Sequence, residues 1–296
     1  MIVTCLIGDP VEHSVSPHLF GYFAQQCGLN EYAHVKFRVD SKKHENIRKA
    51  IEAIRTLNIA GCNVTLPYKL DVIPLIDVLD ETAQAMGAVN TIVNRNSKLE
   101  GYNTDGIGAI RTIEKKLARI DKEDSILVLG AGGAARAILY EVLKRTGNVT
   151  VLNRSNDRLR RLHSDFQKLD LNFKTGVFSP DNLIKGMADA KFVINATSVG
   201  MSPGDQYSPI PEKVFETVNK DSQIKNKLFF DAIFNPYETR FLELPKTKYG
   251  AKVCSGLYMM IYQGVKAFQL WTGKEVSEEI VEKAHDLLKN ILQKYA

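Results

Sequence analysis

The chain has 296 residues, which is more than one hydrophobic core usually holds, so we expect two domains. Its composition, with 44% hydrophobic and 25% charged residues, is that of an ordinary globular protein. The formal net charge of +5 includes no lysine or arginine run long enough for a nucleic-acid-binding tail, and a mild positive balance suits small anionic ligands.

The first third of the chain predicts strands that alternate with helices. Residues 2–7 are an apolar run that Gly8 ends, which predicts a buried strand. Ser16-Pro17 is typical of a helix start, with Ser16 as the N-cap and proline at the first helical position. The pattern then predicts strands at 35–39 and 59–64, helices at 42–57, 67–76 and 81–86, and a strand pair at 89–93 and 99–102. These elements indicate an α/β fold with a largely parallel sheet.

A second α/β series follows a helix that we expect at 105–117. Its strands are expected at 125–129, 149–152, 192–195 and 228–230, with a helix at 133–145. Two helices close the chain at 257–271 and 278–295, and Ser277 is the expected N-cap of the last one. We therefore expect the chain to pass between the two domains within residues 104–124.

The cysteine spacing and the N-terminus both indicate a cytoplasmic protein. The four cysteines (Cys5, Cys27, Cys62 and Cys254) form no Cys-x-x-Cys pair, which argues against a metal site and against a disulfide framework. The first residues lack the basic region of a signal peptide, and no apolar stretch is long enough to cross a bilayer. We therefore expect reduced cysteines and no membrane partner.

A glycine-rich turn joins the strand at 125–129 to the helix at 133–145. The sequence Gly130-Ala131-Gly132-Gly133-Ala134-Ala135 has the G-x-G-x-x-A spacing of dinucleotide-binding folds. Gly130 allows the tight turn, Gly132 lets the backbone approach a pyrophosphate, and the small Ala135 lets the helix pack on the strand. The phosphates then lie against free amides at the helix N-terminus. An ordinary tight turn is the alternative, and the strand and helix on either side argue against it.

The residues after the next strand favour NADP over NAD. This strand ends at Asn153-Arg154-Ser155, where an NAD enzyme usually has an acid that holds the ribose 2′-hydroxyl. Arg154 and Arg158, one helical turn apart, instead offer guanidinium groups to a 2′-phosphate. The strand at 192–195 leads into a loop of small residues, including Thr197 and Ser198, which can pass close to a nicotinamide ribose.

Five further segments lie mostly outside this nucleotide series. They are Gly8-Asp-Pro-Val-Glu-His-Ser14-Val-Ser16-Pro17, Asn63-Val-Thr65-Leu-Pro67-Tyr-Lys69, Gly87-Ala-Val-Asn90-Thr91, Asn103-Thr-Asp105-Gly106, and Gln263 with Ala267-Phe268. Together with the glycine-rich turn and Asn153-Arg154-Ser155, they resemble shikimate dehydrogenases in the same order and at similar spacing. The resemblance runs from about residue 6 to Gly273, essentially the whole chain.

The resemblance implies a fold of two α/β domains with the active-site cleft between them. Residues 1–106 would form a substrate-binding domain that the C-terminal helices of 255–296 complete. Residues 107–254 would form a Rossmann-type NADP domain. Ile233 in this domain, and Gly256 just after it, are also expected to contact the cofactor. The family reduces 3-dehydroshikimate to shikimate with NADPH, a reversible step of aromatic amino-acid biosynthesis.

Positions in the family's motifs imply the substrate contacts. Ser14 and Ser16 match the residues that bind the substrate carboxylate. Thr65, Asn90 and Gln263 match residues that hydrogen-bond the ring hydroxyls, and a site built from paired polar groups rejects analogues that leave them unpaired.

Lys69 and Asp105 match the family's catalytic pair. Hydride transfer to a carbonyl leaves negative charge on its oxygen, so a donor must lie there and deliver a proton. The alternatives from the residues alone are a surface lysine and an aspartate at a helix start after Thr104. Two other positions depart from the family: Phe234 stands where many members have tyrosine, which removes a hydroxyl contact, and Tyr258 stands where many have glycine.

Three alternatives remain open at this point. A quinate or quinate/shikimate dehydrogenase often uses NAD and has an acid after the second strand, which Asn153-Arg154-Ser155 lacks. A ligand-sensing regulator of the same fold has no need of both Lys69 and Asp105. A simple NADP-binding module leaves the motifs outside 125–201 unexplained. The expected partner is the small ring acid, and the chain is expected to be a monomer or a homodimer.

Overall fold

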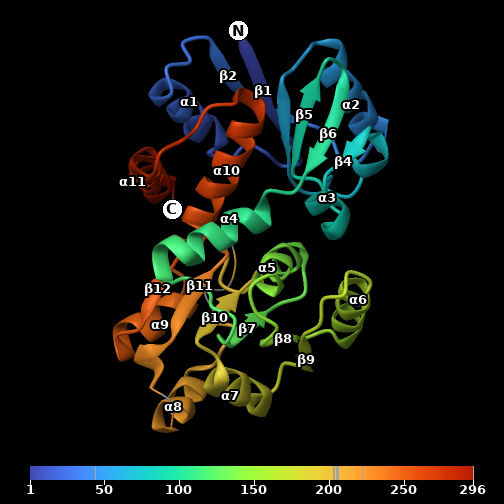
Figure 1. Cartoon of the computed structure of the whole chain (residues 1–296). Helices are drawn as coiled ribbons and strands as arrows, with labels where there is room; N and C mark the ends of the chain where they lie inside the picture. The colour runs from blue at the N-terminus through green and yellow to red at the C-terminus, as the bar shows by residue number, and fades with distance from the viewer. Residues whose placement is uncertain (44, 203, 205–206, 222, 296) are drawn as a thin grey trace. The chain divides into compact units, whose positions relative to one another are not determined.

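The structure, a computed structural model, describes residues 1–43, 45–202, 204, 207–221 and 223–295. It divides into two compact units, each with one six-stranded sheet covered by helices (Figure 1). The first unit contains Met1–Asp105 and Ile261–Asn290, and the second contains Gly106–Met260 with the last residues from Ile291. The expected fold class, two α/β units, is confirmed.

The first sheet is mixed, with the strand order β2-β1-β3-β5-β6-β4. Strand β1 is parallel to β2 and β3, whereas β5 is antiparallel to β3 and β6. The turn between β5 and β6 contains Asn96 and Ser97, both with positive φ, as a two-residue hairpin turn requires. The strands are β1 (Ile2–Gly8), β2 (Tyr32–Arg38), β3 (Gly61–Val64), β4 (Val78–Leu79), β5 (Thr91–Arg95) and β6 (Lys98–Tyr102).

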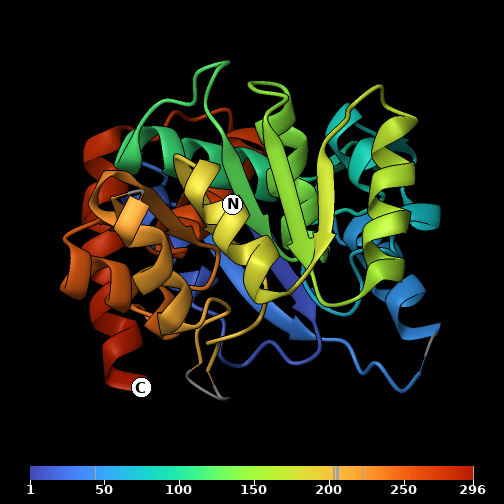
Figure 2. The same cartoon turned by 90° about the horizontal axis from the view of Figure 1, so that it is seen from below.

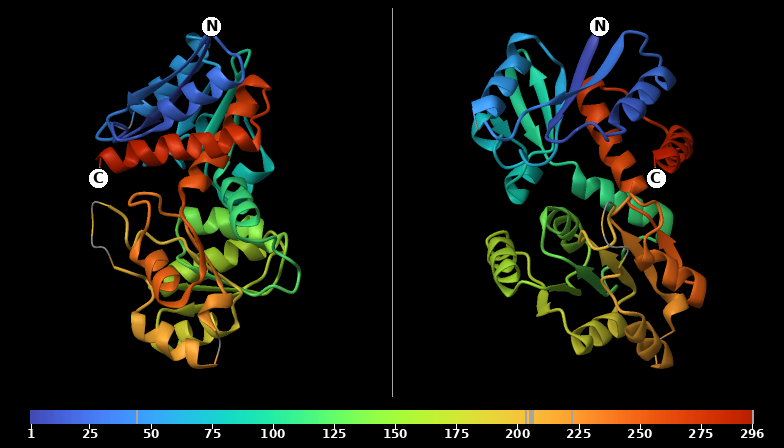
Figure 3. Two further views of the ribbon diagram at one scale, coloured as in Figure 1. Left: turned by 90° about the vertical axis from the view of Figure 1, so that its left-hand side faces the viewer. Right: turned by 180° about the vertical axis from the view of Figure 1, so that it is seen from behind.

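Helices cover both faces of this sheet. On one face, isoleucines at helical spacing in α2 (Glu45–Thr56) pack on strand residues such as Cys62 and Ile92. On the other face, Phe20 of α1 (Ser16–Gln26) and Trp271 of α10 (Leu257–Thr272) have ring centroids 5.0 Å apart. Both views of Figure 3 show that α10 and α11 (Glu278–Tyr295) lie beside the N-terminal elements, and Ile261–Asn290 of these helices belong to the same unit as Met1–Asp105.

The second sheet is entirely parallel, with the strand order β12-β11-β10-β7-β8-β9, and Figure 2 shows β7, β8 and β9 side by side. Helices α7, α8 and α9 cover one face around Phe215, Phe229 and Phe241. The strands are β7 (Ile126–Leu129), β8 (Val149–Asn153), β9 (Lys174–Val177), β10 (Phe192–Asn195), β11 (Leu228–Asp231) and β12 (Lys252–Cys254). The helices are α4 (Asp105–Thr112, continued by a π-helix at Ile113–Leu117), α5 (Gly133–Leu143), α6 (Asn156–Gln167), α7 (Pro180–Asp189), α8 (Glu212–Asp221) and α9 (Arg240–Tyr249).

Two expectations about helices are wrong. Ser16 is the first residue of α1 and not its cap, because Val15 holds the cap position and the Ser16 amide donates to Ser14 Oγ at 3.3 Å. Residues 67–76 form turns and a short 3-10 helix at Ile73–Leu75 in place of an α-helix. Pro74 explains this, since its ring removes one amide donor and would crowd the carbonyl four residues earlier.

The remaining expected elements are present, with boundaries that shift by a few residues, while β4, β9, β12 and α7–α9 were not expected. The last helix is capped as expected, because the Ile280 amide donates to Ser277 Oγ at 3.3 Å. Among the described residues, no helix has the length and apolar character needed to span a membrane.

Candidate functional site

An ion pair marks one edge of the first sheet. Lys69 lies five residues after β3, and Asp105 is the first residue of α4. Lys69 Nζ donates to Asp105 Oδ2 at 2.5 Å, and the two side chains are 28% and 20% exposed. A helix N-terminus favours a carboxylate, so α4 stabilises the charge of Asp105. The pair is therefore preformed and still accessible to a ligand.

Asn90 holds the second oxygen of this carboxylate. Its Nδ2 donates to Asp105 Oδ1 at 2.7 Å, while its Oδ1 accepts from the Thr104 amide at 2.9 Å. Asn90 is 3% exposed, and the neighbouring Thr91 hydroxyl also donates to Asn90 Oδ1, at 3.0 Å. Asn63 Nδ2 in turn donates to Thr91 Oγ1 at 3.2 Å. These buried bonds fix the orientation of Asp105.

The strand topology explains why these residues meet. The carboxyl ends of parallel β1 and β3 lie at one edge of the sheet, where loops of α/β proteins bind ligands. Because β5 is antiparallel to β3, its first residue, Thr91, pairs with Asn63 at the same edge. Thr65 follows β3 there, and a Cβ on Gly8 would lie 2.3 Å from Thr65 Cγ2, so only glycine fits at the end of β1.

Gln263 joins this network from α10. Its Oε1 lies 3.3 Å from Thr104 Oγ1, and Thr104 is buried against Asn90. The structure thus brings Lys69, Asn90, Asp105 and Gln263 into one connected set of polar contacts. The sequence analysis assigned no role to Asn63 and Thr91 and considered Thr104 only as a residue before a helix start, although all three stand in the quoted motifs. Asn63 is the penultimate residue of β3, Thr91 begins β5, and Thr104 lies two residues after β6.

Ser14 lies in the loop between β1 and α1, and Ser16 is the first residue of α1; residues 9–16 together are called the serine loop below. Both are half-buried, and Ser14 Oγ donates to Ser16 Oγ at 3.1 Å. Asp9 anchors the start of the loop, accepting from the Ser41 amide at 2.9 Å and from Arg38 Nε at 2.7 Å. The bonds from Ser41 and then from Arg38 lower the pKa of Asp9 to about 2.

The glycine-rich turn of the second unit lies at the carboxyl end of β7. Gly130 has φ of 111°, and a Cβ there would lie 2.8 Å from the Ala196 carbonyl oxygen, which excludes any larger residue. Gly132 is the N-cap of α5, and a Cβ on Gly132 or Gly133 would meet nothing within 4 Å. Ala135, in the first turn of α5, is fully buried. Open space beside free helix amides suits a pyrophosphate.

Arg154 and Arg158 are exposed at the carboxyl end of β8. Ser155 caps α6, since its Oγ accepts from the Arg158 amide at 3.3 Å, and Asn153 Nδ2 donates to the Ser155 carbonyl at 3.1 Å. Neither guanidinium forms an ion pair with any acid in the part of the chain that the structure describes. Both charges are therefore available to an anion such as a 2′-phosphate.

A buried Asn–Asp pair holds the loop after β10. Asn195 and Asp231 are register partners, and Asn195 Nδ2 donates to Asp231 Oδ1 at 3.0 Å. Asn195 Oδ1 accepts from the Thr197 amide at 3.0 Å and from its hydroxyl at 2.7 Å, while Ser198 is exposed. The conformation of the loop that carries Thr197 and Ser198 thus depends on this pair.

Asp231 also holds the turn after β11. It is fully buried and accepts from Thr239 Oγ1 at 2.6 Å and from the Ile233 amide at 3.0 Å. Burial raises the pKa of Asp231 to about 6, although these hydrogen bonds favour its ionised form. Gly256 closes the turn, because its amide donates to the Ile233 carbonyl at 2.9 Å and a Cβ there would lie 2.3 Å from the Ala232 oxygen. Phe234 is half-buried in the same turn.

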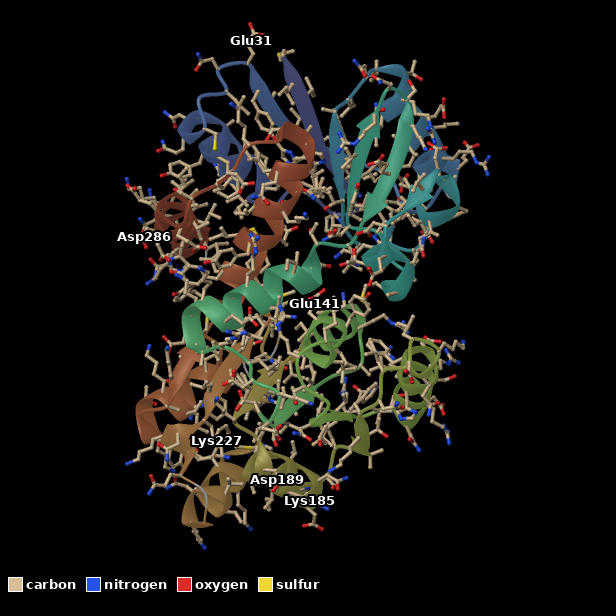
Figure 4. The ribbon with its side chains drawn as sticks, viewed as in Figure 1. Glu31, Glu141, Lys185, Asp189, Lys227 and Asp286 are labelled. Carbon is tan, nitrogen blue, oxygen red and sulfur yellow. The ribbon has the colours of Figure 1, made fainter. Side chains whose placement is uncertain are left out.

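Other buried charges in the second unit have structural partners. Lys227 Nζ, labelled in Figure 4, donates to the carbonyls of Ala188 and Ala190 at 3.0 and 2.8 Å at the end of α7. Burial lowers the pKa of Lys227. Glu141 of α5 accepts from Arg145 at 3.2 Å. Tyr258, which departs from the family's pattern, has Lys116 Nζ 4.0 Å from its ring centroid.

Comparisons with known proteins agree on one family. A sequence model of the shikimate dehydrogenase substrate binding domain matches residues 6–92, and one of the shikimate 5'-dehydrogenase C-terminal domain matches residues 256–284. The shikimate dehydrogenase (NADP(+)) of Methanosphaera stadtmanae is 39% identical over 298 residues, covering 98% of this chain and 97% of the relative.

Solved structures agree with the sequence relatives. A crystal structure of shikimate dehydrogenase in complex with NADP+ has a TM-score of 0.84 at 36% identity, covering 96% of this chain and 94% of that chain. The shikimate 5-dehydrogenase of Listeria monocytogenes, in complex with shikimate and NAD, has a TM-score of 0.84 at 29% identity, covering 97% and 96%.

Proposed function

The chain belongs to the shikimate dehydrogenase family, and we propose that its first unit binds the ring acid while its second unit binds NADP. The reaction is the reversible NADPH-dependent reduction of 3-dehydroshikimate to shikimate, in aromatic biosynthesis, so the protein is an oxidoreductase. The proposed domains are residues 1–106 with the C-terminal helices of 255–296, and residues 107–254.

Lys69 and Asp105 are the proposed catalytic pair. The observation that carries this assignment is the 2.5 Å contact between them. Both side chains are partly exposed, while Asn90, which holds Asp105, is buried. A reduced nicotinamide, when bound, would supply the hydride. Lys69 has three ammonium protons and uses one in its hydrogen bond to Asp105, so another can be transferred to the substrate oxygen as negative charge develops on it. In the reverse direction, Asp105 is the member of the pair that can accept the hydroxyl proton, because an ammonium has no acceptor.

The ring acid is proposed to bind along the same sheet edge. The Ser14 and Ser16 hydroxyls are two short donors for the carboxylate next to the N-terminus of α1. Thr65, Asn90 and Gln263 are the proposed partners of the ring hydroxyls. Asn90 and Gln263 are already oriented by Thr104, which supports a rigid arrangement that discriminates between hydroxyl patterns.

The cofactor is proposed to lie along the carboxyl ends of β7, β8, β10 and β11. The pyrophosphate would lie at Gly130, Ala131, Gly132, Gly133 and Ala134, with the 2′-phosphate at Asn153, Arg154, Ser155 and Arg158. The nicotinamide side would be lined by Thr197, Ser198, Ile233 and Gly256. The open space at Gly132 and the unpaired guanidinium groups support this arrangement.

We further propose a cytoplasmic enzyme that is a monomer or a homodimer. Four free thiols, three of them buried, suit a reducing compartment. Size-exclusion chromatography with light scattering would distinguish the two assembly states.

Absorbance of the reduced nicotinamide tests the function. Shikimate and quinate are each offered with NADP+ and with NAD+, and we expect the highest kcat/KM for shikimate with NADP+. Faster turnover of quinate with NAD+ would instead indicate a quinate dehydrogenase. Saturable shikimate binding by calorimetry, without reduction of either nucleotide, would contradict the enzyme and favour a ligand-sensing regulator.

A further inference from the structure

A lysine of β2 lies against the serine loop. Lys36 Nζ donates to the carbonyl oxygen of Glu12 at 2.6 Å and to that of Ser14 at 3.3 Å. Side chains two residues apart on a strand share a face, so Lys36 lies on the same face as His34. His34 packs on Phe20 of α1, with ring centroids 4.4 Å apart, and the serine loop leads into that helix. In Figure 1, β2 lies beside β1, from which the serine loop begins.

The other charges of this region are paired with one another. Arg38 Nε lies 2.7 Å from Asp9 and 3.9 Å from Glu12, so one cation faces two carboxylates. Glu12 Oε2 also accepts from the Val11 amide at 3.0 Å. Lys36 has only neutral carbonyl partners and no ion pair among the described residues. No carboxylate of the described residues therefore compensates its positive charge.

Lys36 contacts a residue of the proposed carboxylate site. Ser14 contacts Lys36 through its carbonyl oxygen, and its hydroxyl is the proposed donor to the carboxylate. Lys36 Nζ lies 3.3 Å from the carbonyl oxygen of the residue whose hydroxyl is the proposed donor, and charges closer than the Debye length of about 8–10 Å are not fully screened. The attraction is therefore only partly screened.

We propose that Lys36 is a specificity-determining residue, which contacts the serine loop at the carbonyls of Glu12 and Ser14 and favours an anionic ring acid by its charge. Two serine hydroxyls alone donate to a carboxylate without neutralising it, whereas a nearby ammonium lowers the cost of removing that anion from water. This inference rests on the proposed carboxylate site at Ser14 and Ser16.

Kinetics with a charged and a neutral substrate test the proposal. For Lys36→Met we expect the KM for shikimate to rise about three- to tenfold with little change in kcat. The kcat/KM for shikimate methyl ester, which lacks the negative charge, should stay within about twofold of wild type. Lys36→Arg keeps the charge and should restore most of the affinity. The control is Lys49→Met, which removes an exposed lysine of α2 that pairs with Glu45 at 2.9 Å and should leave both substrates unaffected.

Ionic strength supplies a second measurement. Added salt should raise the KM for shikimate in the wild type and in Lys49→Met, and the increase should be smaller in Lys36→Met. Equal losses for shikimate and its ester would assign Lys36 a purely structural role and overturn the proposal, as would an unchanged KM. Ser14→Ala and Ser16→Ala distinguish the proposed carboxylate site from the proposed role of Lys36. If both variants bind shikimate as wild type does, the carboxylate site itself is wrong. If they bind it more weakly but Lys36→Met has no effect, only the inference on Lys36 is refuted.

Discussion

Lys69 Nζ lies 2.5 Å from Asp105 Oδ2, although 36 residues separate the two in the chain. Asn90 Nδ2 binds the other oxygen of the same carboxylate at 2.7 Å, so Asp105 cannot turn away from the lysine without losing a buried hydrogen bond. The contact is thus a fixed feature of the fold, set by the edge of the sheet where β3 ends and β5 begins.

If this pair transfers the proton, Lys69→Ala should lower kcat by about two to four powers of ten, the usual contribution of general acid–base catalysis. The KM for shikimate should change far less, because Ser14, Ser16 and Gln263 keep their contacts. Steady-state kinetics would measure both constants, and Lys98→Ala, at the exposed start of β6, is the control.

Asp105→Asn should also lower kcat and change the pH profile, because a neutral amide cannot accept the hydroxyl proton. The double variant should lose little more than either single one, since both residues act on one proton transfer. A Lys69→Ala protein with near-normal kcat would refute the assignment of the pair.

The cofactor preference is expected to depend on Arg154 and Arg158. Replacing both with alanine should raise the KM for NADP more than tenfold, because each lost charge-assisted bond contributes about 1.5–3 kcal/mol. The KM for NAD, which has no 2′-phosphate, should change little. Arg160→Ala is a matched control on the same helix, since Arg160 pairs with Asp157 at 2.6 Å. Equal losses with both cofactors would mean that the arginines support α6 and not the phosphate.

The sequence predicted the parts of the fold that have a local signature. Apolar runs ended by glycine marked β1 and β7, and the spacing of Gly130 and Gly132 marked the turn before α5. The two-residue strand β4 has no such pattern, and it forms because Val78 and Leu79 pair with β6. Ser16 was misassigned as a cap because the hydroxyl that meets its amide belongs to Ser14, two residues earlier.

In the candidate site, too, some residues could be predicted from sequence motifs and others could not. Lys69 and Asp105 were identified because they stand in motifs of a known family, and their residue types alone would not have distinguished them from surface charges. Lys36 had no signal, since its partners are backbone carbonyls, which any residue provides. The contact between Asn195 and Asp231 depends on the pairing of β10 with β11, which no local pattern specifies.

Asp231 provides a prediction about stability at neutral pH. Its pKa is raised from 3.8 to about 6 by burial, so between these pH values the folded state binds a proton that the unfolded state releases. The contribution of Asp231 to stability therefore falls as pH rises from 4 to 6, and above pH 6 the buried charge costs about 3 kcal/mol. Asp231→Asn keeps acceptors for Asn195 and Ile233 and can donate to the Thr239 hydroxyl.

We therefore expect Asp231→Asn to be more stable than wild type by about 1–3 kcal/mol at pH 7.5, with a difference that shrinks towards pH 5. Urea unfolding at both pH values would measure it. Asp231→Ala is the contrasting variant, because it leaves the Asn195 and Thr239 donors without an acceptor. It should be less stable than wild type at both pH values. A lower stability of Asp231→Asn at pH 7.5 would show that the hydrogen bonds of the carboxylate outweigh its burial.

His34 provides the opposite dependence in the first unit. It is 8% exposed, its Nδ1 lies 2.8 Å from Thr4 Oγ1, and its ring stacks near Trp271 with centroids 5.9 Å apart. Burial lowers the pKa of His34 from 6.5 to about 3. Between pH 6.5 and about 3, the unfolded chain therefore binds a proton at His34 that the folded chain does not. The free energy of unfolding is thus unaffected by His34 above pH 6.5 and decreases as the pH falls below it.

Each pH unit below 6.5 should cost about 1.4 kcal/mol, so roughly 2–3 kcal/mol is lost by pH 4.5. His34→Phe cannot titrate, and Thr4 keeps a partner in Tyr32, whose hydroxyl lies 2.7 Å from Thr4 Oγ1. The free energy of unfolding, measured in urea at half-unit steps between pH 7.5 and 4.5, should fall less steeply for this variant than for wild type. His18→Gln, at an exposed position of α1, should keep the wild-type slope. Parallel curves for His34→Phe and wild type would mean that other groups, such as the buried His285, whose pKa is also lowered by burial, cause the loss in acid.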